Sequence, residues 1–443
     1  MASDKTPHFS YLEELNMTKR MSRVLALAVG ALLTVGLVGC GNSSSQSKSE
    51  PVKITYWHRM TGSWNKAQQK TIDDFNKSQS KYKVVATSQG SYDALQQKLM
   101  AAAKSKTLPV MAQAPTTNIG DYVKNDFLIP WDSQMLHGSD KLSAAQLSDV
   151  YPSFLKAGEY KGKYYGLPYS ESTQVLFYNE TLMKKYNLTM PKTWDDIEKM
   201  GPALKKDGLA TLAMDQSYDV QLEGMAMQAG HKLITADGKA NLNAPTTLAA
   251  VDKILSLRKA GYIKTAGTDY YFTVPFSQQK AVFGIGSSSS IGSVEAPKGM
   301  KWGTATVPSF ANDSVAEPLN GNDNVLFKGA SKAQQQGAWA FQKFLLKKQN
   351  AAYWAKKSGY VPITKSATQS ATYQNYLKAN PTFKAAVDAS DTAFASTVFA
   401  GYGDYRNDLM DTVDSTLTKG TAGKTAFDAL QKKTEAILKE NKN

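Results

Sequence analysis

Short apolar runs alternate with longer amphipathic stretches along this chain, and the alternation starts twice. The first series predicts strand, helix, strand, helix and strand in turn, at 52–57, 66–78, 83–87, 92–104 and 109–114. The second series predicts strands at 173–178 and 281–285 and helices at 194–205, 248–260, 334–347 and 425–439. Strands that alternate with helices predict an open, mostly parallel sheet with helices on both faces. Two such series in 443 residues therefore predict an α/β protein of two lobes.

The N-terminal segment indicates where the chain is expected to act. A basic cluster precedes an uncharged run at 24–38, which is shorter than the roughly 20 residues of a membrane-spanning helix and is typical of a secretory signal. The run ends in Leu37-Val38-Gly39-Cys40, which resembles the bacterial lipobox and contains the only cysteine. We therefore expect 1–39 to be a signal peptide with an N-terminal extension. Cys40 would carry the lipid, 40–52 would be a flexible tether, and the protein would be anchored on the extracellular face of the cell membrane.

The composition excludes several kinds of site. A single cysteine allows neither an intrachain disulfide nor a cysteine-based zinc site, and the four histidines make a histidine-based metal cluster unexpected. The net charge of +14 favours polyanionic surroundings, which for an exported chain means an acidic cell wall rather than nucleic acid. No phosphate-binding, zinc-protease or serine-hydrolase motif is present. We therefore predict no catalytic residue, no metal, no cofactor and no nucleic-acid partner.

Polar and aromatic residues gather in loops that follow predicted strands or helices, and ligands of open α/β sheets bind beyond the carboxyl ends of the strands. Ser287 to Ser290 follow one predicted strand, and Tyr92 and Tyr360 stand next to predicted helix ends. A glycine-serine run between a strand and a helix offers N–H groups and hydroxyls that suit a phosphate, a carboxylate or a sugar. Taken alone, the serine run is more typical of a surface turn, and Tyr92 and Tyr360 are more typical of residues that cap the edge of a core.

Seven segments carry a resemblance to a known family: Tyr56-Trp57-His58-x-Met60, Gly90-Ser91-Tyr92, 168–179, Pro191-Lys192-Thr193-Trp194, 287–291, Asn320-Gly321 and 359–365. They resemble the extracellular solute-binding proteins (family 1) of ABC transporters, and most closely the glycerol-3-phosphate-binding proteins. The resemblance implies a two-lobe, periplasmic-binding-protein-like fold of type II with a hinge between the lobes. It places lobe 1 at 53–173 plus 303–359 and lobe 2 at 174–302 plus 360–443.

The resemblance also implies a binding site in which serines, a glycine N–H and an arginine hold a phosphate while tyrosine and tryptophan enclose glycerol. The matching positions are Tyr92, Ser172, Trp194, Ser287, Gly321, Tyr360 and Arg406. Ser288, the next residue of the serine run, is expected as an additional donor. Thr116 stands where the family has an acidic residue, so a larger glycerophosphodiester, a wall-derived glycerol phosphate or a neutral saccharide stays open beside glycerol 3-phosphate.

The resemblance therefore implies a substrate-binding lipoprotein of an ABC importer. It is expected to be a monomer that captures glycerol 3-phosphate or a related glycerophosphodiester or carbohydrate between its lobes and delivers it to the transmembrane subunits of a permease. One alternative is a neutral oligosaccharide-binding protein of a sugar importer. A second is a wall-acting hydrolase that uses two carboxylates, for which Glu171 and Asp323 are candidates. A third is an adhesin that does not close on a small ligand.

Overall fold

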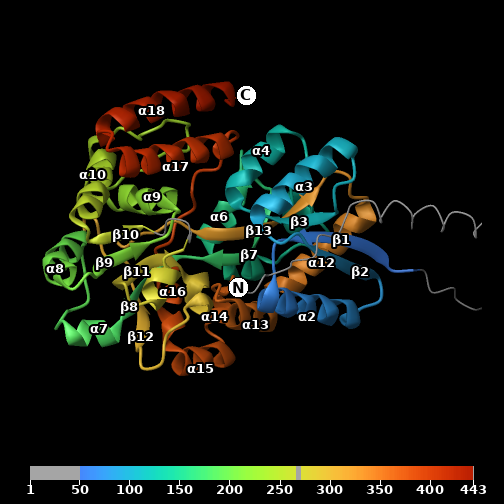
Figure 1. Ribbon diagram of the computed structural model, residues 1–443. Coiled ribbons are helices and arrows are strands. Elements are labelled where there is room, and N and C mark those ends of the chain that lie inside the picture. The colour runs from blue at the N-terminus through green and yellow to red at the C-terminus, as the bar shows by residue number, and fades with distance from the viewer. Residues whose placement is uncertain (1–49, 266–270, 443) are drawn as a thin grey trace, which may run out of the picture. The chain divides into compact units, whose positions relative to one another are not determined.

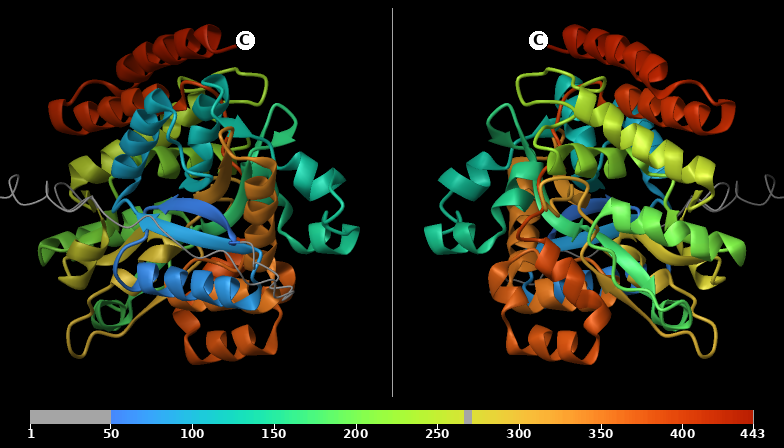
Figure 2. Two further views of the ribbon diagram at one scale, coloured as in Figure 1. Left: turned by 90° about the vertical axis from the view of Figure 1, so that its right-hand side faces the viewer. Right: turned by 90° about the vertical axis from the view of Figure 1, so that its left-hand side faces the viewer.

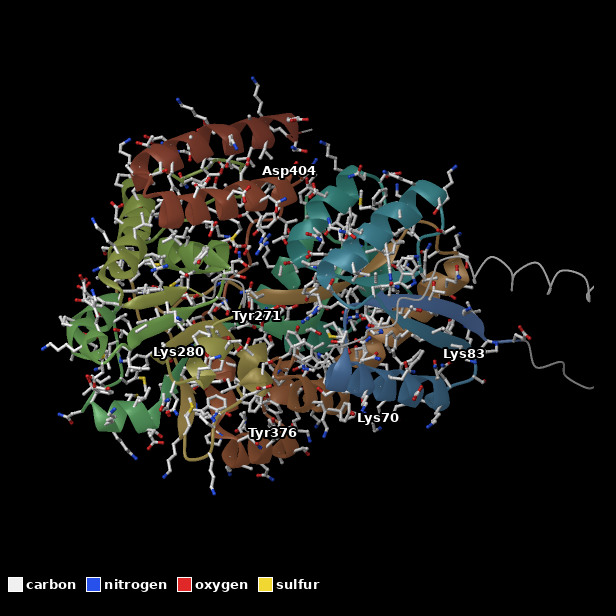
Figure 3. The ribbon with its side chains drawn as sticks, viewed as in Figure 1. Lys70, Lys83, Tyr271, Lys280, Tyr376 and Asp404 are labelled. Carbon is white, nitrogen blue, oxygen red and sulfur yellow. The ribbon has the colours of Figure 1, made fainter. Side chains whose placement is uncertain are left out.

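Most strands gather into two sheets in the computed structural model, which describes residues 50–265 and 271–442. Both sheets belong to one compact unit, which spans Glu50–Asn443. The expected signal peptide and Cys40 lie outside the described residues. Exposed lysines such as Lys70, Lys83 and Lys280 come from the elements of both sheets (Figure 3), so the positive charge is not confined to one of them.

The first sheet has the strand order β2-β1-β3-β13-β4, with β7 also paired to β13. The strands are β1 (Val52–His58), β2 (Tyr82–Ser88), β3 (Met111–Ala114), β4 (Leu128–Ile129), β7 (Gly166–Ser172) and β13 (Asn320–Phe327). The helices around this sheet are α2 (Gly62–Ser78), α3 (Tyr92–Ser105), α4 (Ile119–Lys124), α5 (Ala144–Asp149), α6 (Pro152–Ala157), α12 (Lys332–Leu346) and α13 (Lys348–Ser358). Helices cover both faces of this sheet, with α2 on one side of β1 and α3 on the other (Figure 1). Alternate residues of β1 explain this: Ile54 and Tyr56 pack in the cluster of α2 and α12, whereas Trp57 packs in the cluster of α3 and α4.

The second sheet has the order β10-β9-β11-β8-β12. The strands are β8 (Gln174–Asn179), β9 (Ala210–Met214), β10 (Ile263–Thr265), β11 (Ala281–Ser287) and β12 (Trp302–Ala305). Helices on one face include α8 (Trp194–Lys206), α9 (Tyr218–Gln228), α10 (Pro245–Ala260), α17 (Tyr402–Lys419) and α18 (Gly423–Glu440), and the other face carries α11 (Thr273–Ser277), α14 (Lys365–Thr368), α15 (Ala371–Ala379) and α16 (Lys384–Ala389). The short elements α7 (Glu180–Lys185), β5 (Glu159–Tyr160) and β6 (Lys163–Tyr164) complete the unit. Figure 2 shows α17 and α18, in red, side by side.

The predicted elements match the observed ones to within a few residues. The helix expected at 248–260 is α10, and Gly261 ends it in the left-handed region with φ +81°. In the first sheet β1 is parallel to β2 and β3, and β13 is antiparallel to its partners β3, β4 and β7. In the second sheet β9 is parallel to β10 and β11, and β8 is antiparallel to β11 and β12. Among the strands that the structure describes, each sheet therefore has one reversed strand beside others that share a direction, which agrees with the expectation of mostly parallel sheets.

The connection between the sheets explains these directions. Only Thr173 separates β7 from β8, so the chain leaves the first sheet and enters the second at once. It returns between β12 and β13, and β13 therefore enters the first sheet from the junction of the two sheets. Strands β8 and β13 thus run away from the junction while their neighbours run toward it. β12 stays in the second sheet through Ala305, so 303–305, which were expected in lobe 1, pair with lobe 2.

Candidate functional site

Two serines connect the carboxyl ends of strands from different sheets. Ser172 ends β7 and Ser287 ends β11. The Ser287 hydroxyl lies 2.9 Å from the Ser172 hydroxyl, which in turn donates to the Asn320 carbonyl at 2.8 Å. Ser287 Oγ also accepts from the Ser289 N–H at 3.2 Å and so caps the short turn that follows β11. The two sheets therefore meet through a chain of hydroxyl groups.

Tyr92 and Gly321 lie next to this chain. Tyr92 is the first residue of α3, whose N-terminus is capped by Ser91. The Tyr92 hydroxyl accepts from the Asn322 amide at 2.7 Å and lies 3.4 Å from the Gly321 carbonyl oxygen. Gly321 has φ +152°, and a Cβ there would lie 1.9 Å from the Ser170 carbonyl oxygen. Only glycine fits this crossing of β7 and β13.

Tyr360 completes the cluster through a residue that the sequence did not single out, Arg59. The Arg59 guanidinium donates to the Tyr360 hydroxyl, and its carbon lies 4.5 Å from the centre of the Tyr92 ring. Tyr360 is 2% exposed, and its ring stacks on Trp354 at 6.2 Å. Arg59 follows β1 directly. Its position at the carboxyl end of a strand could have identified it in the sequence as a candidate ligand-binding residue.

Ser288 lies behind the cluster rather than at its surface. Its N–H donates to the Thr173 carbonyl at 2.9 Å, and the residue is 0% exposed. Among the residues that the structure describes, no group forms a hydrogen bond with its hydroxyl. Thr116 begins a short turn that is separated from β3 only by Pro115, and it is half-buried. It therefore follows a strand whose carboxyl end points to the same junction.

Two predicted site residues have other surroundings. Trp194 is 2% exposed and packs with Ile197 and Leu212 in the second-lobe core, because it is the first residue of a helix whose capping box turns its ring inward. Arg406 of α17 pairs with Asp219 of α9, at 2.6 Å from Nε to the carboxylate. The Arg406 side chain is 40% exposed, whereas that of Asp219 is 8% exposed. The structure thus brings neither residue into contact with the serine and tyrosine cluster.

Glu171 and Asp323 form a buried carboxyl pair on β7 and β13, with exposures of 1% and 0%. Burial raises the pKa of Asp323 to about 7. Burial, together with the charge of Asp323, raises the pKa of Glu171 well above its ordinary value. A Cβ at Gly166 would lie 2.4 Å from the Asp323 carboxylate, so the pair is enclosed by backbone. Such a pair has no room for the substrate that a hydrolase would have to bind.

Within residues 50–265 and 271–442, no group of three or more His, Cys, Asp or Glu residues is arranged to hold a metal ion. None of the helices in these ranges has the length and apolar character needed to span a membrane.

A family model described as bacterial extracellular solute-binding protein matches residues 70–385. The chain belongs to this family. As a solute-binding protein it is similar to the sn-glycerol-3-phosphate-binding periplasmic proteins UgpB of Shigella dysenteriae and Rhizobium meliloti. Both are 24% identical, over 79% of this chain and 82% of the relative for the first, and over 74% and 79% for the second.

Solved structures share the fold of this solute-binding protein. The cyclic α-maltosyl-1,6-maltose binding protein from Arthrobacter globiformis superposes with a TM-score of 0.78 at 23% identity, covering 88% of this chain and 100% of that one. UgpB from Mycobacterium tuberculosis in complex with glycerophosphocholine gives 0.77 at 21% identity, covering 88% and 99%. The predicted two-lobe α/β fold is confirmed by these matches. Relatives and neighbours are solute-binding proteins rather than enzymes, which confirms the expectation of no catalysis. The chain is accordingly the substrate-binding protein of an ABC importer.

Proposed function

We propose that this protein captures glycerol 3-phosphate or a related glycerophosphodiester between its two lobes and delivers it to a membrane permease. The observation that carries the proposal is the contact from Ser287 of the second lobe to Ser172 of the first. A ligand that bonds both serines would hold the two lobes together, and its differential affinity would favour the closed state. The lobes of this proposal follow the boundaries given above, with 303–305 assigned to lobe 2.

The residues around the serines suit a phosphate with a small polyol attached. Ser172 and Ser287 supply hydroxyls, Gly321 supplies a backbone N–H free of a side chain, and Tyr92 supplies a ring face. The ring of Tyr360 is packed in the first-lobe core, so this residue contributes through its hydroxyl, which holds Arg59. Each hydrogen bond to a charged group in such a site contributes about 1.5–3 kcal/mol. Arg406 is included as a second-lobe cation, because Asp219 is paired with only its Nε and one Nη atom. Trp194 is left out because its ring lies in the core.

Two kinds of relative support different ligands. The sn-glycerol-3-phosphate-binding relatives and the glycerophosphocholine complex favour a phosphorylated ligand. The neighbour that binds cyclic maltosyl-maltose favours the alternative of a neutral oligosaccharide, and Thr116 agrees with it because a short neutral side chain leaves room. The hydroxyl chain suits both ligand classes. The cationic side chains favour the phosphorylated one.

We further propose that the protein is exported, acylated at Cys40 and held as a monomer on the extracellular face of the membrane. The lipobox-like segment at 37–40 supports the export and the acylation. Labelled palmitate should enter the wild-type protein and not the Cys40→Ser variant, which should appear in the medium. Equal labelling of both proteins would contradict acylation at Cys40.

Isothermal titration calorimetry tests the ligand class. Wild-type protein should bind sn-glycerol 3-phosphate or glycerophosphocholine more tightly than maltose. The Ser287→Ala variant should lose about 10-fold or more in affinity, the value of one hydrogen bond to a charged group. Ser256→Ala is the matched control, since Ser256 is exposed on α10. Binding of maltose alone would favour the oligosaccharide alternative, and an unchanged affinity of Ser287→Ala would remove the junction from the binding site.

A further inference from the structure

Arg59 lies in an enclosure made of neutral and aromatic groups. It occupies the turn between β1 and α2, and its guanidinium carbon lies 4.5 Å from the centre of the Tyr92 ring and 4.9 Å from that of Trp64. The guanidinium donates to the Tyr360 hydroxyl, and the Arg59 backbone N–H donates to the Gln113 side chain at 3.3 Å. Two rings and a hydroxyl thus hold the planar cation in one orientation.

This cation has no negative partner in the part of the chain that the structure describes. No carboxylate there lies within 4 Å of it, and its buried Nε atom donates to no described group. Tyr360 does not compensate, because burial raises the pKa of its hydroxyl above the ordinary value and keeps it neutral. Arg406, by contrast, is paired with Asp219. A largely buried charge without a partner costs free energy. An anion that binds Arg59 would therefore supply the missing partner, and it would not compete with a carboxylate of the protein.

We propose that Arg59 binds an oxyanion of the transported solute from the first lobe, so that the ligand is an anionic one with its phosphate, or a carboxylate in its place, between Tyr92 and Tyr360. The inference rests on the proposed function and narrows it, because it excludes neutral saccharides as the main ligand. A guanidinium suits this task because its parallel N–H groups match the oxygens of phosphate and carboxylate. Tyr92 connects this position to the junction through its contacts with Asn322 and Gly321.

Calorimetry with matched probes tests the proposal. The probes are sn-glycerol 3-phosphate, D-glycerate, glycerol and maltose, which separate a phosphate, a carboxylate, the bare polyol and a neutral sugar. The variants are Arg59→Gln, which removes the charge, and Arg59→Lys, which keeps it without the planar fork. Arg258→Gln is the matched control, since Arg258 is exposed in the last turn of α10. Urea unfolding of each variant reports whether the fold is retained.

We expect Arg59→Gln to weaken binding of the anionic probe by about 10- to 100-fold, and Arg59→Lys to weaken it less. The affinity of Arg59→Gln should also depend less on ionic strength, which a purely structural role would not produce. Tight binding of sn-glycerol 3-phosphate or of D-glycerate identifies which oxyanion the site accepts, and either supports the proposal.

Two results would overturn it in different ways. If the wild type binds sn-glycerol 3-phosphate and Arg59→Gln binds it equally well, the inference fails while the proposed function stands. An equal loss for all probes, accompanied by a lower unfolding midpoint, would likewise show that Arg59 only braces Trp64, Tyr92 and Tyr360. If the wild type binds maltose alone, or binds neither the four probes nor glycerophosphocholine, the proposed function fails together with the inference.

Discussion

Replacing Asp323 by asparagine should change how stability depends on pH. Asp323 is 0% exposed, and burial raises its pKa from 3.8 to about 7. The folded protein therefore keeps this proton up to about pH 7, whereas the unfolded chain loses it near pH 4. Between these values the folded state binds more protons, so stability falls as pH rises. The Asp323→Asn variant cannot titrate at this position and loses that part of the dependence.

The size of the effect follows from the difference between the two pKa values. It corresponds to a few kcal/mol, most of which falls between pH 5 and pH 8. Relative to the wild type, Asp323→Asn should therefore gain on the order of 2 kcal/mol in free energy of unfolding over that range. His58, whose pKa burial lowers to about 4, has the opposite dependence, but it is present in both proteins and cancels in the difference. Glu171 does not cancel: burial and the charge of Asp323 raise its pKa in the wild type, the variant lacks that charge, and the change in Glu171 adds to the difference with the same sign.

Urea unfolding at pH 5, 6, 7 and 8 measures this difference directly. Asp313→Asn is the matched control, because Asp313 is exposed and has a positive φ that asparagine also tolerates. Its profile should run parallel to that of the wild type. Parallel profiles for wild type and Asp323→Asn would refute the reasoning, since they would mean that Asp323 titrates alike in the folded and unfolded chain.

Three further substitutions test particular contacts. Gly321→Ala should lower the free energy of unfolding by about 2–4 kcal/mol, because its Cβ would meet backbone at 1.9 Å, whereas Gly329→Ala, with open space around it, should be neutral in the same urea titration. Trp194→Ala should lower the free energy of unfolding by about 3–5 kcal/mol, because it leaves a cavity in the core. A melting temperature equal to that of the wild type would contradict the buried position of Trp194. Arg406→Ala should lower the free energy of unfolding by about 1–3 kcal/mol, because it leaves the buried Asp219 unpaired while Arg406 itself is partly exposed. The double variant with Asp219→Asn should recover this stability in full, because it no longer contains an unpaired carboxylate.

The sequence predicted several of the longer helices and part of the strands of both sheets, because their apolar spacing is unbroken. These elements are α2, α3, α8, α10, α12 and α18 with β1, β2, β3, β8 and β11. The sequence did not predict β13 at 320–327, whose first residues, Asn320-Gly321-Asn322-Asp323-Asn324, have the composition of a turn. These polar side chains are used inside the sheet: Asn324 accepts from the Tyr56 hydroxyl at 2.7 Å and donates to Gln342 at 2.8 Å. Partners this distant in sequence cannot be inferred from local composition.

The candidate site was predicted in part for a similar reason. The resemblance identified positions next to the ends of strands and helices, and the fold brings these ends to one junction. The residues that it brings together are Ser172, Ser287, Tyr92, Gly321 and Tyr360. The surroundings of single side chains were not visible in the sequence. They depend on contacts such as the pairing of Arg406 with Asp219, which are 187 residues apart.

The proposed transport requires that a phosphorylated small molecule be held between the two lobes. A crystal structure of the protein grown with sn-glycerol 3-phosphate tests this requirement most directly. We predict ligand density within hydrogen-bonding distance of both Ser172 and Ser287, with its phosphate next to a guanidinium group. Ligand bound to one lobe alone, or an empty junction at saturating ligand concentration, would contradict the central claim.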